Sequence, residues 1–137
     1  MKKFLFVIFS INKLNMSWYV NISYLITAIK KVPGIVVDIR FFEPIHVKEA
    51  VEAVEELAPD YIGMSLIQKN YVASMEFANK IKEKLPDTEF VLGNIEASFM
   101  TEHIMKTYPE IDYIVKCYSR EKSRKSRRSC QRRNSRI

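Results

Sequence analysis

Polar residues and a glycine lie at the ends of two predicted strands, at positions where side chains commonly meet a ligand. Ser65 follows the apolar run "YIGM", and Gly93 and Asn94 follow the run "FVL". A hydroxyl at such a position either hydrogen-bonds a ligand or caps the next helix. A glycine allows either close approach of a ligand or a tight turn. The pattern indicates a candidate binding edge without identifying the ligand.

The segment "SINKLNMSWYVN" at 10–21 separates the first predicted strand from the first predicted helix. It has no glycine, whereas dinucleotide fingerprints and P-loops need glycines so that backbone N–H groups can reach phosphates. This argues against an NAD or ATP site. Trp18 and Tyr19 in this segment either line a wide, flat ligand or begin the helix and pack inward.

Candidate catalytic and metal-binding residues are scarce. The two histidines, His46 and His103, have no Cys, Ser or carboxylate partner at a known motif spacing, so we expect both on the solvated surface. The two cysteines, Cys117 and Cys130, are 13 residues apart with no His nearby, and they match no zinc or iron–sulfur spacing. We therefore predict no catalytic residue and no protein metal ligand.

Strands and helices must alternate along the chain to position these residues. Apolar runs predict strands at 4–9, 34–42, 60–67, 88–93 and 111–115, and helical spacing of apolar residues predicts a helix in each interval between them. Strict alternation with short connections predicts an α/β, doubly wound (Rossmann-like) fold, βαβαβαβαβ, with a parallel five-stranded sheet. We predict the strand order 3-2-1-4-5. In this class, ligands bind at the carboxyl ends of the strands.

Charge divides the 137-residue chain into two parts. Residues 116–137 hold ten Lys/Arg and one Glu, whereas residues 1–115 hold twelve Lys/Arg and fifteen Asp/Glu, so the net charge of +6 comes from the tail. We predict one domain at 1–116 and a disordered basic tail at 117–137, because the tail has too little apolar surface to offset the entropy of ordering. "MKKFLFVIFS" has no cleavage site and predicts a buried strand of a cytoplasmic protein, not a signal peptide.

Four segments carry a family resemblance: "NISYLITAIKKVPGIVVDIRFFEP", "VEELAPDYIGMSL", "NKIKEKLPDTEFVLGN" and "YPEIDYIV". Together they resemble the cobalamin (B12)-binding domain at the front of many radical S-adenosylmethionine (SAM) enzymes, over residues 3–115. Asn21 matches an Asn near the start of the family's first helix. The residues at 60–65 match a segment of the form D-x-IG-x-S, and Gly93-Asn94 matches a Gly-Gly pair.

The sequence also departs from the family. Domains of the methionine-synthase type carry Asp-x-His-x-x-Gly, whose His ligates cobalt, but no His precedes His46 here. The resemblance therefore implies cobalamin held without a protein histidine on cobalt. Asn94 in place of the second Gly implies a narrower slot for the nucleotide tail of cobalamin. "KCYS" at 116–119 replaces the family's Gly-Glu-Gly-Glu, and the Cys-x₃-Cys-x₂-Cys motif is absent.

The resemblance implies a cobalamin-binding domain that is a fragment of a B12-dependent radical SAM enzyme and is not catalytic alone. The iron–sulfur cluster and SAM would belong to the missing radical SAM domain, which becomes the expected partner. The resemblance also implies cofactor contacts for seven residues on three loops. They are Trp18 and Tyr19 against the ring, Asn21, Ser65 and Leu66 along the ring or tail, and Gly93 and Asn94 at the slot.

The tail keeps other interpretations open. It is an out-of-frame translation, a basic arm that binds nucleic acid by neutralising phosphates, or a solvated segment without a role. The corresponding alternatives for the whole chain are a nucleic-acid-binding module and a ligand-free structural or interaction domain. Without a final helix, one face of the sheet stays bare near the fifth strand, which also suggests a homodimer.

Overall fold

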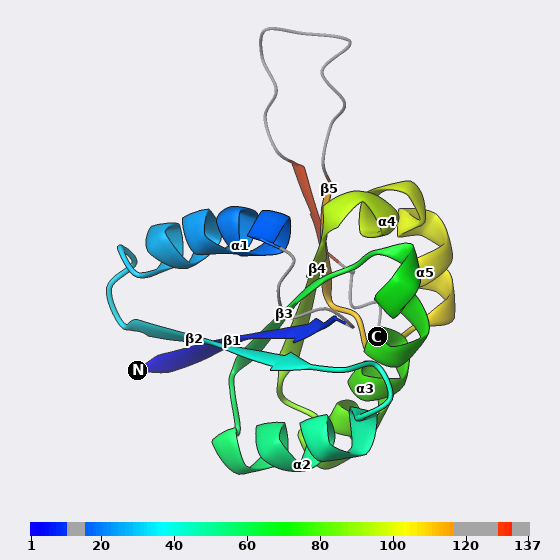
Figure 1. Cartoon of the computed structure of the whole chain (residues 1–137), viewed down its shortest axis with the longest axis horizontal. Coiled ribbons are helices and arrows are strands. Elements are labelled where there is room, and N and C mark those ends of the chain that lie inside the picture. The colour runs from blue at the N-terminus through cyan, green and yellow to red at the C-terminus, as the bar shows by residue number, and fades with distance from the viewer. Residues whose placement is uncertain (11–15, 117–128, 133–137) are drawn as a thin grey trace, which may run out of the picture.

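The computed structural model describes residues 1–10, 16–116 and 129–132, and for 16–21 and 129–132 it describes the backbone alone. Strands and helices alternate along the chain, as Figure 1 shows. The strands are β1 (Lys2–Phe9), β2 (Ile35–Phe42), β3 (Tyr61–Ser65), β4 (Glu89–Gly93), β5 (Tyr113–Lys116) and β6 (Ser129–Arg132). The helices are α1 (Met16–Ile29), α2 (Val47–Leu57), α3 (Tyr71–Lys84), α4 (Asn94–Phe99) and α5 (Thr101–Thr107), with a 3-10 turn, η1 (Gln68–Asn70).

The predicted fold class is confirmed, because β1 to β5 form a parallel sheet with helices between successive strands. The predicted strand order 3-2-1-4-5 is wrong, since the observed order is β2-β1-β3-β4-β5-β6. β2 carries the charged pair Asp38 and Arg40, both about half exposed. A strand with charges on one face fits the edge of a sheet, whereas the uncharged β3 fits the centre between β1 and β4.

Two segments differ from the prediction. The interval between β4 and β5, where we predict one helix, holds two, because α4 covers Asn94–Phe99 and α5 covers Thr101–Thr107. The tail expected to be disordered contributes β6, which pairs antiparallel with β5, Lys116 opposite Ser129 and Tyr113 opposite Arg132. The prediction of disorder is therefore wrong for Ser129–Arg132, while residues 117–128 and 133–137 lie outside the described residues. β6 protects the backbone of β5 from being an open sheet edge.

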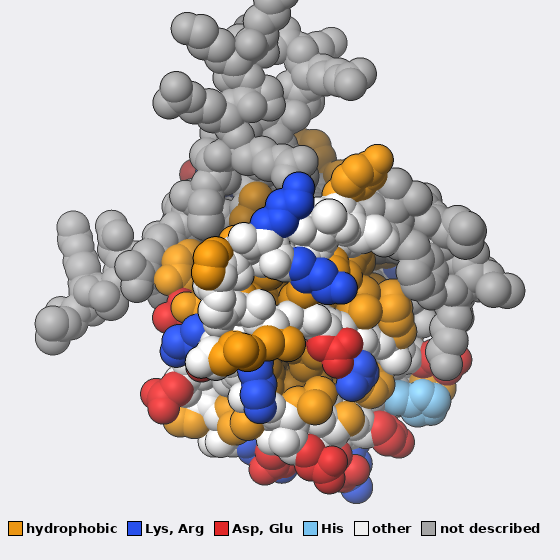
Figure 2. Space-filling model, turned by 90° about the vertical axis from the view of Figure 1, so that its left-hand side faces the viewer, with side chains coloured by type: hydrophobic (Ala, Val, Ile, Leu, Met, Phe, Trp, Pro, Cys, Tyr) orange, Lys and Arg blue, Asp and Glu red, His pale blue; other side chains and the backbone are white. Residues whose placement is uncertain are grey.

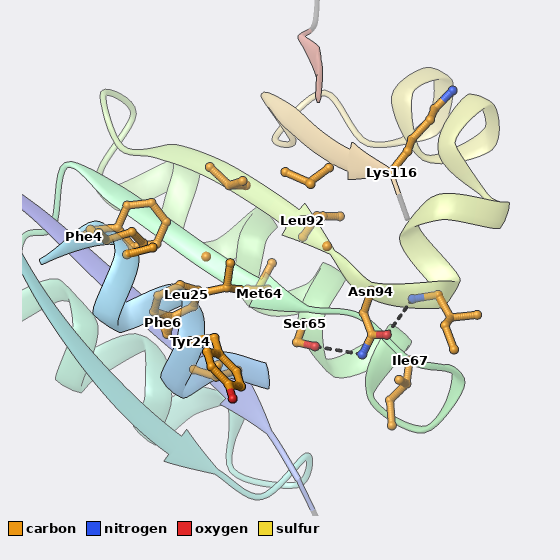
Figure 3. Close-up of a pocket in the computed structure, with 18 residues that line it drawn as sticks. Phe4, Phe6, Tyr24, Leu25, Met64, Ser65, Ile67, Leu92, Asn94 and Lys116 are labelled. Carbon is orange, nitrogen blue, oxygen red and sulfur yellow. Dashed lines mark hydrogen bonds between the residues drawn. The ribbon is translucent and has the colours of Figure 1, made fainter. Parts of the chain in front are cut away.

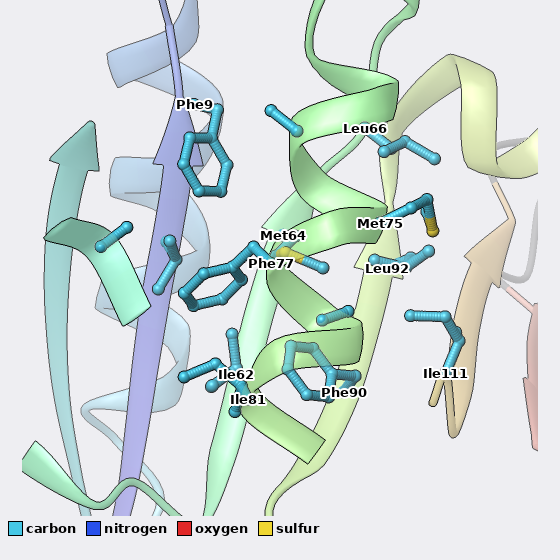
Figure 4. Close-up of a cluster of buried hydrophobic side chains, with 14 of the residues drawn as sticks. Phe9, Ile62, Met64, Leu66, Met75, Phe77, Ile81, Phe90, Leu92 and Ile111 are labelled. Atoms are coloured by element: carbon cyan, nitrogen blue, oxygen red, sulfur yellow. The ribbon is translucent and has the colours of Figure 1, made fainter. Parts of the chain in front are cut away.

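One face of the sheet holds the larger core. Alternate residues of the strands point to this face, where they pack against α2, α3, α4 and α5. Phe77 of α3 makes edge-to-face ring contacts with Phe9 of β1, at 5.4 Å between centroids, and with Phe90 of β4, at 6.3 Å. Figure 4 shows these rings between α3 and the sheet. Burial of these side chains is the main stabilising contribution, at about 1.5–3 kcal/mol for each large apolar side chain.

The outer faces of the helices are polar. Glu49, Glu52 and Glu56 of α2 are exposed, while Val51 and Val54 of the same helix are buried. Figure 2 shows acidic side chains gathered at the lower edge of the molecule, where α2 lies. Within the described ranges, every helix is too short or too polar to cross a lipid bilayer.

The opposite face of the sheet is covered by α1 (Figure 1). Ile22, Ile26 and Ile29 of α1 pack on Phe6 and Ile8 of β1 and on the inward side chains of β2. In the described part of the chain, no second helix packs beside α1 on this face. Residues of β3, β4 and β5 that point to this face therefore border open space, which defines the site described next.

Candidate functional site

A cavity of about 790 Å³ lies between α1 and the face of β3, β4 and β5 that the larger core does not use. Its lining comes mainly from hydrocarbon side chains. Strand alternation decides which residues face the cavity. Ile62 of β3 and Phe90 of β4 point to the larger core, so the residues next to them in each strand point to the cavity. The strand residues that alternation turns toward the cavity are Phe4, Phe6, Gly63, Ser65, Val91, Gly93 and Val115.

Two glycines shape the cavity in opposite ways. A Cβ atom on Gly93 would meet no protein atom within 4 Å, so the missing side chain leaves open space there. A Cβ atom on Gly63 would lie 2.8 Å from Cε1 of Phe4 and 2.9 Å from Cδ1 of Phe6. The two rings, whose centroids are 4.9 Å apart, therefore rest against the backbone of β3. Gly93 keeps one part of the cavity open, and Gly63 lets aromatic rings close the other.

Ser65 and Asn94 lie at the carboxyl ends of β3 and β4, at the other end of the cavity from Phe4 (Figure 3). The Asn94 Nδ2 donates to Ser65 Oγ at 2.9 Å, and Asn94 Oδ1 accepts the N–H of Ile95 at 2.7 Å. The backbone φ of Asn94 is 79°, in the left-handed region that glycine and then asparagine tolerate best. This conformation agrees with the predicted match of Asn94 to a glycine position.

Asn70 holds the ends of two neighbouring strands together, and sequence reasoning missed it. Its Nδ2 donates to the carbonyl of Phe9 at 3.2 Å and to the carbonyl of Ser65 at 2.9 Å, while Oδ1 accepts the N–H of Ile67 at 2.9 Å. The residue is only 1% exposed. A single Asn before a predicted helix reads as an ordinary cap, so the sequence carries no signal for this cross-link. Through its bond to the Ser65 carbonyl, Asn70 fixes the backbone of Ser65 at the end of β3.

The structure separates the remaining predicted contact residues. The side chain of Leu66 is fully buried in the larger core, and its N–H donates to the Gly93 carbonyl at 2.9 Å. Leu66 thus holds the end of β4 at Gly93 by a backbone hydrogen bond, while its side chain lies on the other face of the sheet from the cavity. The backbones of Trp18, Tyr19 and Asn21 lie in α1, whereas their side chains lie outside the described residues.

Sequence reasoning also missed the aromatic and aliphatic side chains of the cavity. Phe4 and Phe6 alternate with core residues in β1, and Leu25 lies on α1 above the sheet. The run at 4–9 is apolar at every position, so the sequence does not separate Phe4 and Phe6 from the core residues between them. A sheet face of this kind is ordinarily buried beneath a helix, so it gave no sign of a ligand.

Charged groups are few around the cavity. Among the described residues that line it, Lys116 is the only charged one, and Figure 3 shows its side chain directed away from Ser65 and Asn94. The predicted surface positions of both histidines are confirmed, since both are exposed. His46 Nδ1 lies 3.9 Å from Glu43 Oε2 in a separate hollow of about 270 Å³ beside β2. In the described ranges, no three His, Cys, Asp or Glu residues gather as a metal site.

A family model supplies the connection to known proteins. The model for the B12 binding domain matches residues 19–124, which is most of the chain and includes every strand of the cavity except β1. The match continues past Lys116 into the segment expected to be the tail. No curated protein matches the chain. The matched span, together with the parallel sheet and the cavity at its carboxyl edge, shows that this chain belongs to the B12-binding domain family.

Proposed function

We propose that the chain binds cobalamin with its nucleotide tail in the cavity between α1 and the strands β3, β4 and β5. The observation that carries this proposal is the open space at Gly93, where a Cβ atom would meet nothing within 4 Å although both neighbouring strands are packed. The tail of cobalamin ends in a flat aromatic base. A flat base needs a slot that is wide in one plane and free of side chains along one wall, and Gly93 supplies such a wall.

The size and chemistry of the cavity support the same ligand. Ligand pockets typically measure about 300–1,000 Å³ and are mostly apolar with a few polar groups, and this cavity of about 790 Å³ is of that kind. Apolar walls favour an aromatic base because its burial removes apolar surface from water. The polar groups of Ser65 and Asn94 at the other end suit the polar part of the tail that leads back to the ring.

The predicted contact residues take definite roles in this proposal. Gly93 and Asn94 border the entry of the tail, and Ser65 offers its hydroxyl beside them. Leu66 acts through its hydrogen bond to the Gly93 carbonyl rather than by touching the cofactor. Trp18, Tyr19 and Asn21 follow the loop after β1, on the side where we propose that the ring lies. We propose that cobalt takes no histidine from this chain.

We further propose that the domain serves a B12-dependent radical SAM enzyme and is not catalytic by itself. Bound cobalamin supplies the methyl-relay chemistry, because such chemistry belongs to the cofactor. The chain contributes binding, orientation and exclusion of water from the tail. An iron–sulfur cluster and SAM would bind to a separate domain.

Equilibrium dialysis of the full chain against hydroxocobalamin tests the first proposal. We expect protein-bound corrinoid near one equivalent, co-eluting with folded protein in gel filtration, with a visible spectrum that shows no histidine on cobalt. Folded protein that retains no corrinoid would contradict the proposal.

Sequencing of the gene around codon 116 tests the second proposal. A neighbouring reading frame that encodes Gly-Glu-Gly-Glu and then Cys-x₃-Cys-x₂-Cys is the expected result. A single verified frame through the tail, without those motifs in any frame, would contradict it.

A further inference from the structure

We propose that the cavity selects among cobamides by the chemistry of the terminal base of the tail. It favours a base whose far edge is hydrocarbon, such as dimethylbenzimidazole, over a purine such as adenine. The selection rests on the proposed function, since it requires the tail to enter the cavity. The residues that make the selection are Phe4, Phe6, Gly63 and Val91.

The inner end of the cavity is the part that would meet the far edge of the base. Ser65 pairs with Gly93 in the register of β3 and β4, and Gly63 pairs with Val91 one step further in. At about 3.3 Å per residue, Gly63 and Val91 lie roughly 7 Å below Ser65 and Gly93. A base that enters beside Gly93 therefore presents its far edge to Gly63, Val91 and the ring of Phe4.

Hydrogen-bonding side chains are missing from this inner end, among the described residues. Phe4, Phe6 and Val91 offer only hydrocarbon, and Gly63 offers no side chain. The backbone groups of the central strands already bond to one another in the sheet. Four polar side chains line the described cavity. Ser65 and Asn94 bond to each other at the carboxyl edge, Lys116 ends β5, and Tyr24 of α1 is 75% exposed.

Adenine carries an amino group and ring nitrogens on the edge that would be buried here. A polar group buried without a partner loses its bonds to water, and this loss typically weakens binding by about 10- to 100-fold. Dimethylbenzimidazole carries two methyl groups on that edge and loses no hydrogen bond. Because Phe4 and Phe6 pack on Gly63, the inner end of the cavity offers only hydrocarbon, and it therefore favours dimethylbenzimidazole over adenine.

Competition dialysis of the full chain with three corrinoids tests the selection. The probes are cobalamin, the same corrinoid with an adenine base, and cobinamide, which lacks the base and its nucleotide. We expect cobalamin to bind roughly 10-fold or more tightly than the adenine form. Equal binding of these two overturns the selection and leaves the proposed function standing. Absence of binding by all three overturns the proposed function itself.

A hydroxyl placed in the inner end should reduce the selectivity. Val91→Thr keeps the branched shape and adds a group that can bond to adenine, so we expect the ratio of the two affinities to fall toward one. Val36→Thr makes the same change on β2, where the side chain is 48% exposed and remote from the cavity, and it should leave the ratio unchanged. A ratio unaffected by Val91→Thr, in protein shown to be folded by circular dichroism, would contradict the assignment of the inner end.

Discussion

The side-chain amide of Asn94 donates a 2.9 Å hydrogen bond to the hydroxyl of Ser65 and so links the carboxyl ends of β3 and β4. The two residues are 29 positions apart in the chain. Both border the cavity, and the strands that end beside them are paired by register at Ser65 and Gly93. The bond joins the two side chains at one end of the cavity, and Asn94 makes it from a left-handed backbone with φ 79°.

The left-handed conformation of Asn94 makes its substitutions distinguishable. Asn94→Ala and Asn94→Gly both lose the side-chain bonds to Ser65 and to the N–H of Ile95. Alanine tolerates the left-handed backbone region poorly because of its Cβ atom, whereas glycine adopts it freely. We expect Asn94→Ala to have a free energy of unfolding about 1–2 kcal/mol lower than Asn94→Gly. Urea unfolding of both variants measures the difference. Equal stability of the two would contradict a left-handed residue at this position.

Two glycines should respond in opposite ways to alanine. Gly93 has an extended backbone and free space around a Cβ atom, so Gly93→Ala should leave the free energy of unfolding unchanged or raise it by about 0.4–1 kcal/mol. Its affinity for cobalamin should fall, because the new methyl group enters the cavity. Gly34→Ala is the matched control, since Gly34 has φ 80° in a turn before β2. It should lower stability and spare affinity. Unchanged cobalamin affinity in Gly93→Ala would count against the cavity as the binding site.

The buried amide of Asn70 should matter more for stability than an exposed one. Asn70→Ala leaves the carbonyls of Phe9 and Ser65 and the N–H of Ile67 without their partner. We expect the free energy of unfolding to fall by about 2–4 kcal/mol, since each buried group left unpaired costs about 1–3 kcal/mol. Asn79→Ala removes one exposed bond to Glu110 and should change stability by less than about 0.5 kcal/mol. Similar losses in both variants would refute a strand-linking role.

Asp60 should make stability depend on pH at the other edge of the sheet. Its carboxylate accepts the N–H of Lys3 at 2.7 Å and the ammonium of Lys2 at 3.1 Å, and these bonds lower the pKa of Asp60 below its usual 3.8. The folded state therefore gains stability above pH 3.8 and loses it as the pH falls through the lowered value. The urea midpoint should drop over this acidic range, and the drop should be smaller in Asp60→Asn.

Asp87→Asn is the control for this pH dependence, because Asp87 is exposed and belongs to a turn. It should show the same acidic drop as the unmodified chain. A drop of equal size in all three proteins would assign the pH dependence to other groups.

The sequence predicts the fold class well because the apolar runs report burial directly. "FLFVIF" in β1 is apolar at every position, and alternate residues face the two cores. The predicted strand order places β2 inside the sheet, whereas Asp38 and Arg40 mark it as an edge strand. Charged residues that alternate with apolar ones within a strand are a signal that the sequence does carry.

Other features could not be predicted from the sequence by physical reasoning. The cross-link through Asn70 depends on where two distant carbonyls meet in space, and the contact of Phe4 and Phe6 with Gly63 depends on strand neighbours. Ser65, Gly93 and Asn94 were identified because they end strands, and the structure brings these three together. Leu66 was implied as a contact by the family resemblance, yet its side chain points into the larger core, as do those of Ile62 and Met64.

Amide NMR of the full chain during titration with cyanocobalamin tests the central claim most directly, since this corrinoid is diamagnetic. We predict that the largest shifts cluster at Gly63, Gly93 and Asn94, and that cobinamide leaves Gly63 unshifted because it lacks the base. Glu49 of α2, beside the small hollow at β2, should not move with either ligand. Shifts confined to the region of Glu49, or an unchanged spectrum at saturating cyanocobalamin, would contradict the assignment of the cavity as the cobalamin site.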